Sequence, residues 1–374
     1  TWNSYSHRPS NQGEAREVFL KNNMPPLPGQ IMENKNLAKT LKIISKKGPE
    51  GFYKGEVAEK IVKTLNEMGG IHSLDDFEEV NGEFVEPINA KYKNNTVFQL
   101  PPNTQGIVAL IILKIIEHLQ FNNFKHNSVE RIHLLIEASK IAYSCRGNLL
   151  GDYNSSKSIM DILKDENTIL DFAKSINKEK ASKLLPPIPS IGSNTVYLTV
   201  VDKDQNIVSF INSIYESFGS GIVPNNTGVI LQNRGSSFNL KENHPNCIKP
   251  KKRPMHTIIP GMVYDSNNRP SLSYGVMGGD YQPIGHAHVL SNIIDHGLNV
   301  QQALDAPRFM PYDTYVDIET GIDPSSIDKL GLLGHDIRFS THPLGGGQAI
   351  SINWSEGTLS GGSDPRKDGL AIGY

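Results

Sequence analysis

Leu185-Pro186-Pro187-Ile188-Pro189-Ser190-Ile191-Gly192-Ser193-Asn194 is followed directly by Thr195-Val196-Tyr197-Leu198-Thr199-Val200-Val201. The first segment contains three prolines and no periodicity, which predicts an extended, exposed tether. The second segment is rich in β-branched residues and predicts a strand. The chain therefore changes from tether to strand between Asn194 and Thr195, and this junction is the best predicted boundary in the sequence.

The β pattern continues beyond the junction. Asp202-Lys203-Asp204-Gln205-Asn206 is turn-like, and residues 207–215 resume a strand pattern, so we expect a hairpin that begins a β-rich half. Further strands are expected at residues 228–232, 257–264 and 272–276. Helices are expected at residues 285–296 and 300–304.

The first half of the chain has mainly helical patterns. Apolar residues recur at helical spacing in residues 37–44, 57–68 and 107–119. Ser128 precedes another amphipathic helix, which we expect to run to about Tyr143. Residues 86–100 alternate like strands. The fold is therefore expected to mix helices and sheets.

Composition excludes several classes of protein. The 374 residues carry 37 basic and 39 acidic side chains, a net charge of −2 that offers no field for nucleic acid or an anionic membrane. Cys145 and Cys247 are too few for a disulfide framework or a thiolate zinc cluster, although one bridge stays open. The longest apolar run, residues 106–113, is shorter than the roughly 20 residues of a membrane helix.

The first residues contain neither an initiator Met nor a signal-peptide pattern. A fragment and a processed chain are both compatible with such a start. We take the cytoplasm as the expected compartment.

Thr195 has two interpretations. Cleavage before it would place a free α-amine beside its hydroxyl, and that amine can act as the general base for a threonine nucleophile. Alternatively, Thr195 is only the first residue of a strand, and spacing alone favours this second interpretation.

Gly278 and Gly279 follow the apolar segment Gly275-Val276-Met277. Two glycines at the end of a strand can turn their backbone N–H groups toward a ligand and form an oxyanion hole. A tight turn without a ligand is an equally good interpretation.

Other suggestive patterns do not meet the requirements of a metal or nucleotide site. Asp202-Lys203-Asp204 lacks the later residues of a calcium loop, and Gly345-Gly346-Gly347 lacks those of a phosphate loop and predicts a flexible turn. His286 and His288 are two residues apart, which prevents them from sharing a metal on one helix face. No metal and no cofactor are expected.

Taken jointly, the motifs resemble the γ-glutamyltransferase family over nearly the whole length of the chain. The more specific matches occur in the family's order. They are Asn194-Thr195, Phe218-Gly219-Ser220-Gly221-Ile222, Lys252-Arg253-Pro254, Gly278-Gly279, Asp305-Ala306-Pro307-Arg308-Phe309 and Ser363-Asp364-Pro365-Arg366-Lys367-Asp368-Gly369.

This resemblance implies an α+β fold, the four-layer αββα sandwich of N-terminal-nucleophile hydrolases. It implies self-cleavage between Asn194 and Thr195, giving a large-subunit-like region (1–194) and a small-subunit-like region (195–374) that build one intertwined domain as a heterodimer. A higher oligomer stays open. Thr195 would be the nucleophile, Ser213 its hydroxyl partner, and Gly278 with Gly279 the oxyanion pair.

The substrate residues depart from the family pattern. Tyr215 replaces an Asn, Ser237 falls where an acidic residue pairs with the substrate ammonium, and Arg234 falls where Gln is usual. His256 and Thr257 replace a Ser-Ser pair. Losing an acidic residue and gaining an Arg favours an acyl group with a carboxylate but no ammonium, similar to glutaryl or cephalosporin acylase substrates.

The expected substrate is a small-molecule amide such as a γ-glutamyl compound, cleaved or transferred through a Thr195 acyl-enzyme. The alternatives are a glutaryl- or cephalosporin-type acylase and a non-catalytic, unprocessed homologue. The family's precursors also carry a further N-terminal segment, with a Gly-rich run and an Arg, which has no counterpart in the sequence; its loss would affect the pocket.

Overall fold

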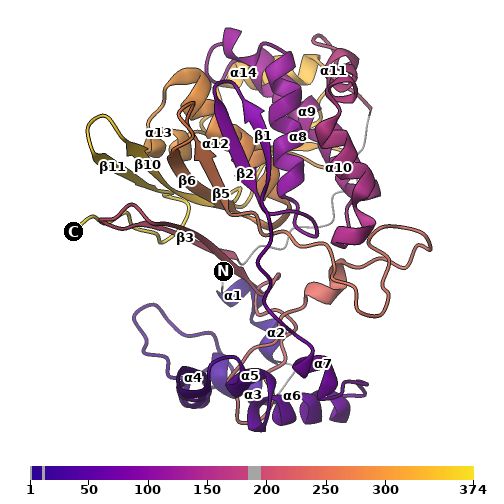
Figure 1. Cartoon of the computed structure of the whole chain (residues 1–374), viewed down its shortest axis with the longest axis vertical. Coiled ribbons are helices and arrows are strands. Elements are labelled where there is room, and N and C mark those ends of the chain that lie inside the picture. The colour runs from indigo at the N-terminus through magenta and orange to yellow at the C-terminus, as the bar shows by residue number, and fades with distance from the viewer. Residues whose placement is uncertain (1, 11–12, 184–194) are drawn as a thin grey trace. The chain divides into compact units, whose positions relative to one another are not determined.

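A computed structural model describes residues 2–10, 13–183 and 195–374 and divides into two compact units (Figure 1). The first unit contains residues 1–84 and 214–234, and the second contains residues 85–213 and 235–374. The expected tether and Asn194 lie outside the described residues. The predicted regions 1–194 and 195–374 are the products of an expected cleavage and do not coincide with these two units. That division stays a prediction.

The first unit is built from short helices. They are α1 (Trp2–Tyr5), α2 (His7–Ser10), α3 (Gly13–Phe19), α4 (Lys35–Lys47), α5 (Glu50–Tyr53), α6 (Glu56–Glu67) and α7 (Asp75–Glu78). Asn34 caps α4 by accepting a hydrogen bond from the Leu37 N–H, and it also donates one to the Gly228 carbonyl at 2.9 Å. The returning segment 214–234 is thereby attached to the helices.

The expected strand at residues 228–232 is wrong. This segment is irregular, and its Leu231 exchanges backbone hydrogen bonds only with Ser220 and Ile222. A positive φ of 64° at Gly228 turns the chain where a ladder would begin. Its β-branched residues therefore lie in a loop.

The second unit contains a six-stranded antiparallel sheet in the order β1-β2-β5-β6-β10-β11. Its strands are β1 (Ile88–Tyr92), β2 (Asn95–Gln99), β5 (Gly261–Tyr264), β6 (Pro270–Met277), β10 (Gly346–Asn353) and β11 (Thr358–Ser363). Gly346 and Gly347 pair with Met277 and Val276, so the flexible turn expected at residues 345–347 is wrong for these two residues.

The second unit also contains helices and a second, smaller sheet. The helices are α8 (Gly106–His118), η1 (Phe121–Asn123), α9 (Val129–Leu149), η2 (Tyr153–Ser155), α10 (Lys157–Lys164), α11 (Glu166–Ser175), η4 (Gly279–Tyr281), α12 (Gln282–His296), α13 (Val300–Asp305) and α14 (Pro324–Leu332). The short turn η3 (Arg234–Ser237) begins where the chain enters this unit from the first. A small sheet holds β7 (Phe309–Pro311), β8 (Val316–Ile318) and β9 (Ile337–Phe339).

Helices and hairpin cover opposite faces of the large sheet (Figure 1). The hairpin is β3 (Thr195–Val201) paired with β4 (Ile207–Ser213). Successive side chains of a strand point to opposite faces. On β6, Gly275 lies against Tyr197 of the hairpin, whereas Val276 packs toward Gly285 of α12.

The core of the second unit includes α8, whose apolar side chains are buried. This helix is apolar on nearly all sides because it contacts β1, β2, α9, α11 and α12. The predicted cap of α9 is confirmed, since the Ser128 hydroxyl accepts a hydrogen bond from the Arg131 N–H at 3.3 Å. The helix itself runs to Leu149, beyond the expected end.

Candidate active site

Thr195 is the first residue of β3 and is 7% exposed. Its antiparallel partner on β4 is Ser213, and its Oγ1 donates a hydrogen bond to Ser213 Oγ at 3.2 Å. Directly paired residues of a hairpin place their side chains on the same face. The structure therefore places the Thr195 and Ser213 hydroxyls in contact, as the family resemblance implied.

The register of the hairpin on β6 locates Thr195 along the sheet. Thr199 Oγ1 donates to Ser273 Oγ at 2.7 Å, and the Tyr197 ring lies over Gly275. Each step of two residues back along β3 matches a step of two forward along β6. The β3 side chains that point toward the sheet therefore run along β6 in the direction of its C-terminal end.

Gly278 connects β6 to η4, whose first residue is Gly279. Their φ angles are 136° and 58°, and the turn closes with a 3.1 Å hydrogen bond from the Tyr281 N–H to the Gly278 carbonyl. A Cβ at Gly278 would lie 2.8 Å from Gly345 Cα. Both conformation and space therefore require glycine here.

Ser237, His256 and Thr257 lie in the same unit as this loop. Ser237 Oγ donates to the Met255 carbonyl at 2.9 Å, and the His256 N–H donates to the Asn103 carbonyl at 2.9 Å. The buried Thr257 and Gly279 share a contact, because Gln105 Nε2 donates to both of their carbonyls at 2.9 Å. Gln105 was not predicted, since a single Gln before an apolar helix carries no distinctive signal.

Tyr215 and Arg234 belong to the first unit. Arg234 is buried, and its guanidinium carbon lies 4.2 Å from the centre of the Tyr215 ring. Tyr215 adopts a φ of 77°. The aromatic side chain thus supports the cation, a contact that the Asn of the family pattern would not make.

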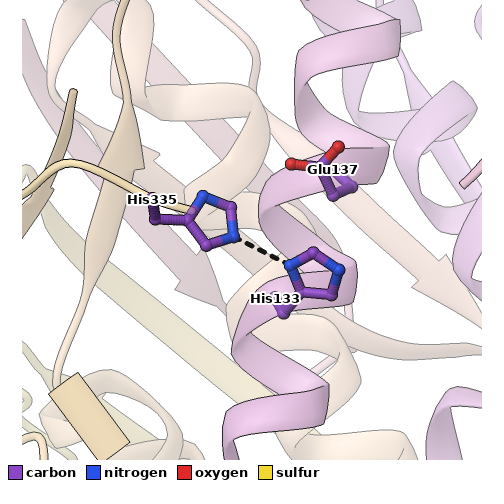
Figure 2. A group of neighbouring side chains, drawn as sticks. All are labelled: His133, Glu137 and His335. Atoms are coloured by element: carbon purple, nitrogen blue, oxygen red, sulfur yellow. Dashed lines mark hydrogen bonds between the residues drawn. The ribbon is translucent and has the colours of Figure 1, made fainter. Parts of the chain in front are cut away.

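His133, Glu137 and His335 form a buried cluster whose ligand atoms lie within 4.8 Å of one another (Figure 2). The spacing of four residues on α9 is the sequence signal for the first two. Figure 2 shows one nitrogen of each histidine ring directed at the other ring, with 2.8 Å between His133 Nδ1 and His335 Nε2.

Hydrogen bonds already occupy these ligand atoms. Lys140 Nζ and the Ser182 N–H donate to the two oxygens of Glu137 at 2.8 and 3.0 Å. His133 Nε2 lies 2.8 Å from the Asn177 carbonyl, which only accepts, so His133 Nε2 is the donor of that hydrogen bond. The cluster fits a structural role, and the expectation that no metal is needed stays a prediction.

Comparisons with known proteins identify the family of this chain. The family model described as gamma-glutamyltranspeptidase matches residues 1–374. A glutathione hydrolase-like YwrD proenzyme of Bacillus subtilis is 36% identical over 367 residues, covering 96% of this chain and 69% of the relative. An oxamate amidohydrolase proenzyme of Klebsiella pneumoniae is 31% identical over 371 residues, covering 96% of this chain and 68% of the relative.

Among solved structures, a cephalosporin acylase from Bacillus halodurans superimposes with a TM-score of 0.90 at 35% identity. The match covers 100% of this chain and 70% of the acylase. In the described residues, no helix is long and apolar enough to cross a membrane.

The fold and these relatives define an enzyme of the amidohydrolase and acyltransferase class. Within that class, the chain belongs to the gamma-glutamyltranspeptidase family.

Proposed function

We propose that this protein is a self-processing amidohydrolase in which Thr195 is an N-terminal nucleophile. The observation that carries the proposal is the 3.2 Å hydrogen bond from Thr195 Oγ1 to Ser213 Oγ at the start of β3. The packing of β3 on β6, the strand that ends directly before Gly278, supports it further. The match to the gamma-glutamyltranspeptidase family adds independent support.

The proposed reaction uses the Thr195 α-amine and hydroxyl, the N–H groups of Gly278 and Gly279, and an external water or amine. Cleavage of the Asn194–Thr195 bond frees the Thr195 α-amine, which takes the hydroxyl proton as Oγ1 attacks the amide carbonyl. The N–H groups of Gly278 and Gly279 stabilise the oxyanion. The proton passes to the leaving amine, and an ester on Oγ1 remains, which water or an amine then cleaves to regenerate Thr195.

The proposed assembly follows from the same cleavage. Regions 1–194 and 195–374 would stay together as a heterodimer in a four-layer αββα sandwich. The helical layer, the six-stranded sheet and the hairpin of the second unit are consistent with three of these layers. We retain the cytoplasm as the proposed compartment.

The proposed substrate is a γ-glutamyl-type amide, consistent with relatives named glutathione hydrolase. An acylase without γ-glutamyl specificity is the second candidate. It is favoured by Ser237, which stands where an ammonium partner is expected and donates its hydroxyl to the Met255 carbonyl. The similarity to a cephalosporin acylase also favours it.

Intact mass tests the nucleophile. The parent protein is expected to split between Asn194 and Thr195 and to hydrolyse an acyl anilide. Thr195→Ala is expected to stay unbroken and inactive, whereas Thr195→Ser keeps a hydroxyl and should retain measurable cleavage and activity. Full activity in Thr195→Ala would refute the proposal, and one unbroken mass for the parent would favour a non-catalytic homologue.

Rates on matched anilides separate the two candidate functions. A γ-glutamyl anilide and a glutaryl anilide differ only in the α-ammonium. A faster γ-glutamyl reaction supports the first candidate, and a faster glutaryl reaction supports the acylase. Restoring an acid with Ser237→Asp should shift the ratio toward the γ-glutamyl compound.

A further inference from the structure

Gln105 lies at the N-terminus of α8 with no exposed surface, and it contacts two segments of the candidate site. Its Nε2 donates to the Gly279 carbonyl and to the Thr257 carbonyl, each at 2.9 Å. Its backbone N–H donates to the His256 carbonyl at 3.0 Å. One residue therefore connects the proposed oxyanion loop with the proposed acyl-binding segment.

The Gln105 amide is itself held in one orientation. Its Oε1 accepts a hydrogen bond from Arg146 Nη1 at 2.7 Å, and the side chain of Arg146 is only 2% exposed. Since guanidinium groups only donate, this contact assigns the oxygen to the Arg146 side and the NH₂ group to the two carbonyls.

Arg146 and Tyr143, both on α9, hold the next residue of the loop. Arg146 Nη1 lies 2.5 Å from Asp280 Oδ1, and the Tyr143 hydroxyl donates to the Asp280 carbonyl at 2.5 Å. Burial raises the pKa of Tyr143, so its hydroxyl keeps its proton and stays a donor. Gly279 and Asp280 are thus fixed by side chains of the helical layer.

These contacts matter because the loop begins with two glycines. Glycine lacks a Cβ and populates many backbone conformations, so Gly278 and Gly279 do not orient their own N–H groups. Oxyanion stabilisation requires donors that are oriented before the reaction. The Gly279 N–H lies in the same peptide as the Gly278 carbonyl, which accepts a hydrogen bond from the Tyr281 N–H at 3.1 Å. Holding the Gly279 and Asp280 carbonyls anchors the turn that makes this hydrogen bond, and with it the direction of the Gly279 N–H.

We propose that Gln105, oriented by Arg146, is the positioning residue that sets the Gly278–Gly279 donors relative to the His256–Thr257 segment. It touches neither the nucleophile nor the reacting carbonyl, and it acts through the backbone it holds. This inference rests on the proposed function for its catalytic consequence, while the holding of the loop is testable without any substrate.

The test compares Gln105→Met with Gln301→Met. Gln301 is a matched control because its side-chain amide also bridges two segments. Its Nε2 donates to Asp305 Oδ1 and to the Ser363 carbonyl, and its Oε1 accepts from the Ser363 N–H. Hydrogen exchange is measured on peptides covering residues 276–284, and kcat is measured per cleaved chain, counted by intact mass. Gln105→Glu, which keeps the shape but loses both donors, serves if Gln105→Met does not fold.

We expect faster exchange in the 276–284 peptide and a kcat lowered at least tenfold in the Gln105 variants, because losing one oriented oxyanion donor lowers kcat about 10²- to 10³-fold. Gln301→Met should lose stability but keep exchange in that peptide and kcat. Unchanged exchange, or changed exchange with an unchanged kcat, overturns the inference. Activity surviving in Thr195→Ala would instead overturn the proposed function and leave the exchange result standing.

Discussion

The Thr195 and Ser213 hydroxyls form the contact on which the candidate chemistry depends. Because the donor is Thr195 Oγ1, Ser213 restricts the rotation of the hydroxyl that must attack. The two residues are cross-strand partners, and their contact therefore depends on hairpin register.

Replacing Ser213 by Ala is expected to slow self-cleavage and lower kcat about 3- to 10-fold, the equivalent of one neutral hydrogen bond of about 0.5–1.5 kcal/mol. Ser213→Thr keeps the hydroxyl and should stay within about twofold of the parent. Time courses of intact mass and steady-state rates measure both effects. Equal rates in Ser213→Ala and the parent would show that the contact has no kinetic role.

At the scale of elements, the packing of β3 against β6 depends on close approach at Gly275. A Cβ at this position would lie 2.5 Å from Tyr197 Cδ2. The outward face of the same hairpin carries exposed apolar residues, among them Val196 and Phe210. A larger side chain is therefore expected to cause a clash on the inward face of this hairpin but not on its outward face.

Gly275→Ala is expected to destabilise the protein by about 1–3 kcal/mol, because the added methyl overpacks the contact with Tyr197. Gly331→Ala is the matched control, since Gly331 lies in α14 and a methyl added there would meet nothing within 4 Å. It should stabilise the protein by up to about 1 kcal/mol through helix propensity. Urea unfolding measures both, and shifts of the same sign would contradict this account.

Prediction from sequence succeeded for elements with a clear period. The hairpin, α4, α6, α8 and α12 were expected at nearly their observed positions, because their apolar spacing depends on neighbours in the chain. The strand β10 was missed since its first residues are Gly346 and Gly347, which have no alternation to detect. Its place in the sheet depends on pairing with β6, far away in the sequence.

At the scale of the whole molecule, several histidines are buried without charge. Burial lowers the pKa of His286 to about 3. Burial, with Lys140 and His133 nearby, lowers the pKa of His335 to about 3. The His286 Nε2 accepts a hydrogen bond from the Val276 N–H at 3.1 Å, which requires an unprotonated nitrogen.

Acid is therefore expected to destabilise the fold before the carboxylates alone would do so. In the unfolded chain these histidines become protonated below their ordinary pKa of 6.5. In the native state they stay neutral until about pH 3. Stability is full above that range and falls with pH, by up to about 1.4 kcal/mol per pH unit for each histidine. His286→Gln should show a shallower pH dependence in urea unfolding between pH 6 and 4, and parallel curves would contradict the assignment.

The sequence by itself determined the family, the mixed fold, the Thr195 hairpin and the pairing of Thr195 with Ser213. These depend on motifs and on contacts between residues close in the chain. Only the tertiary structure decided what holds the site, since Gln105 reaches Gly279 across 174 residues and Arg146 reaches Asp280 across 134. Hydrogen bonds between distant buried groups depend on how helices pack on the sheet, and no local pattern of residues encodes that geometry.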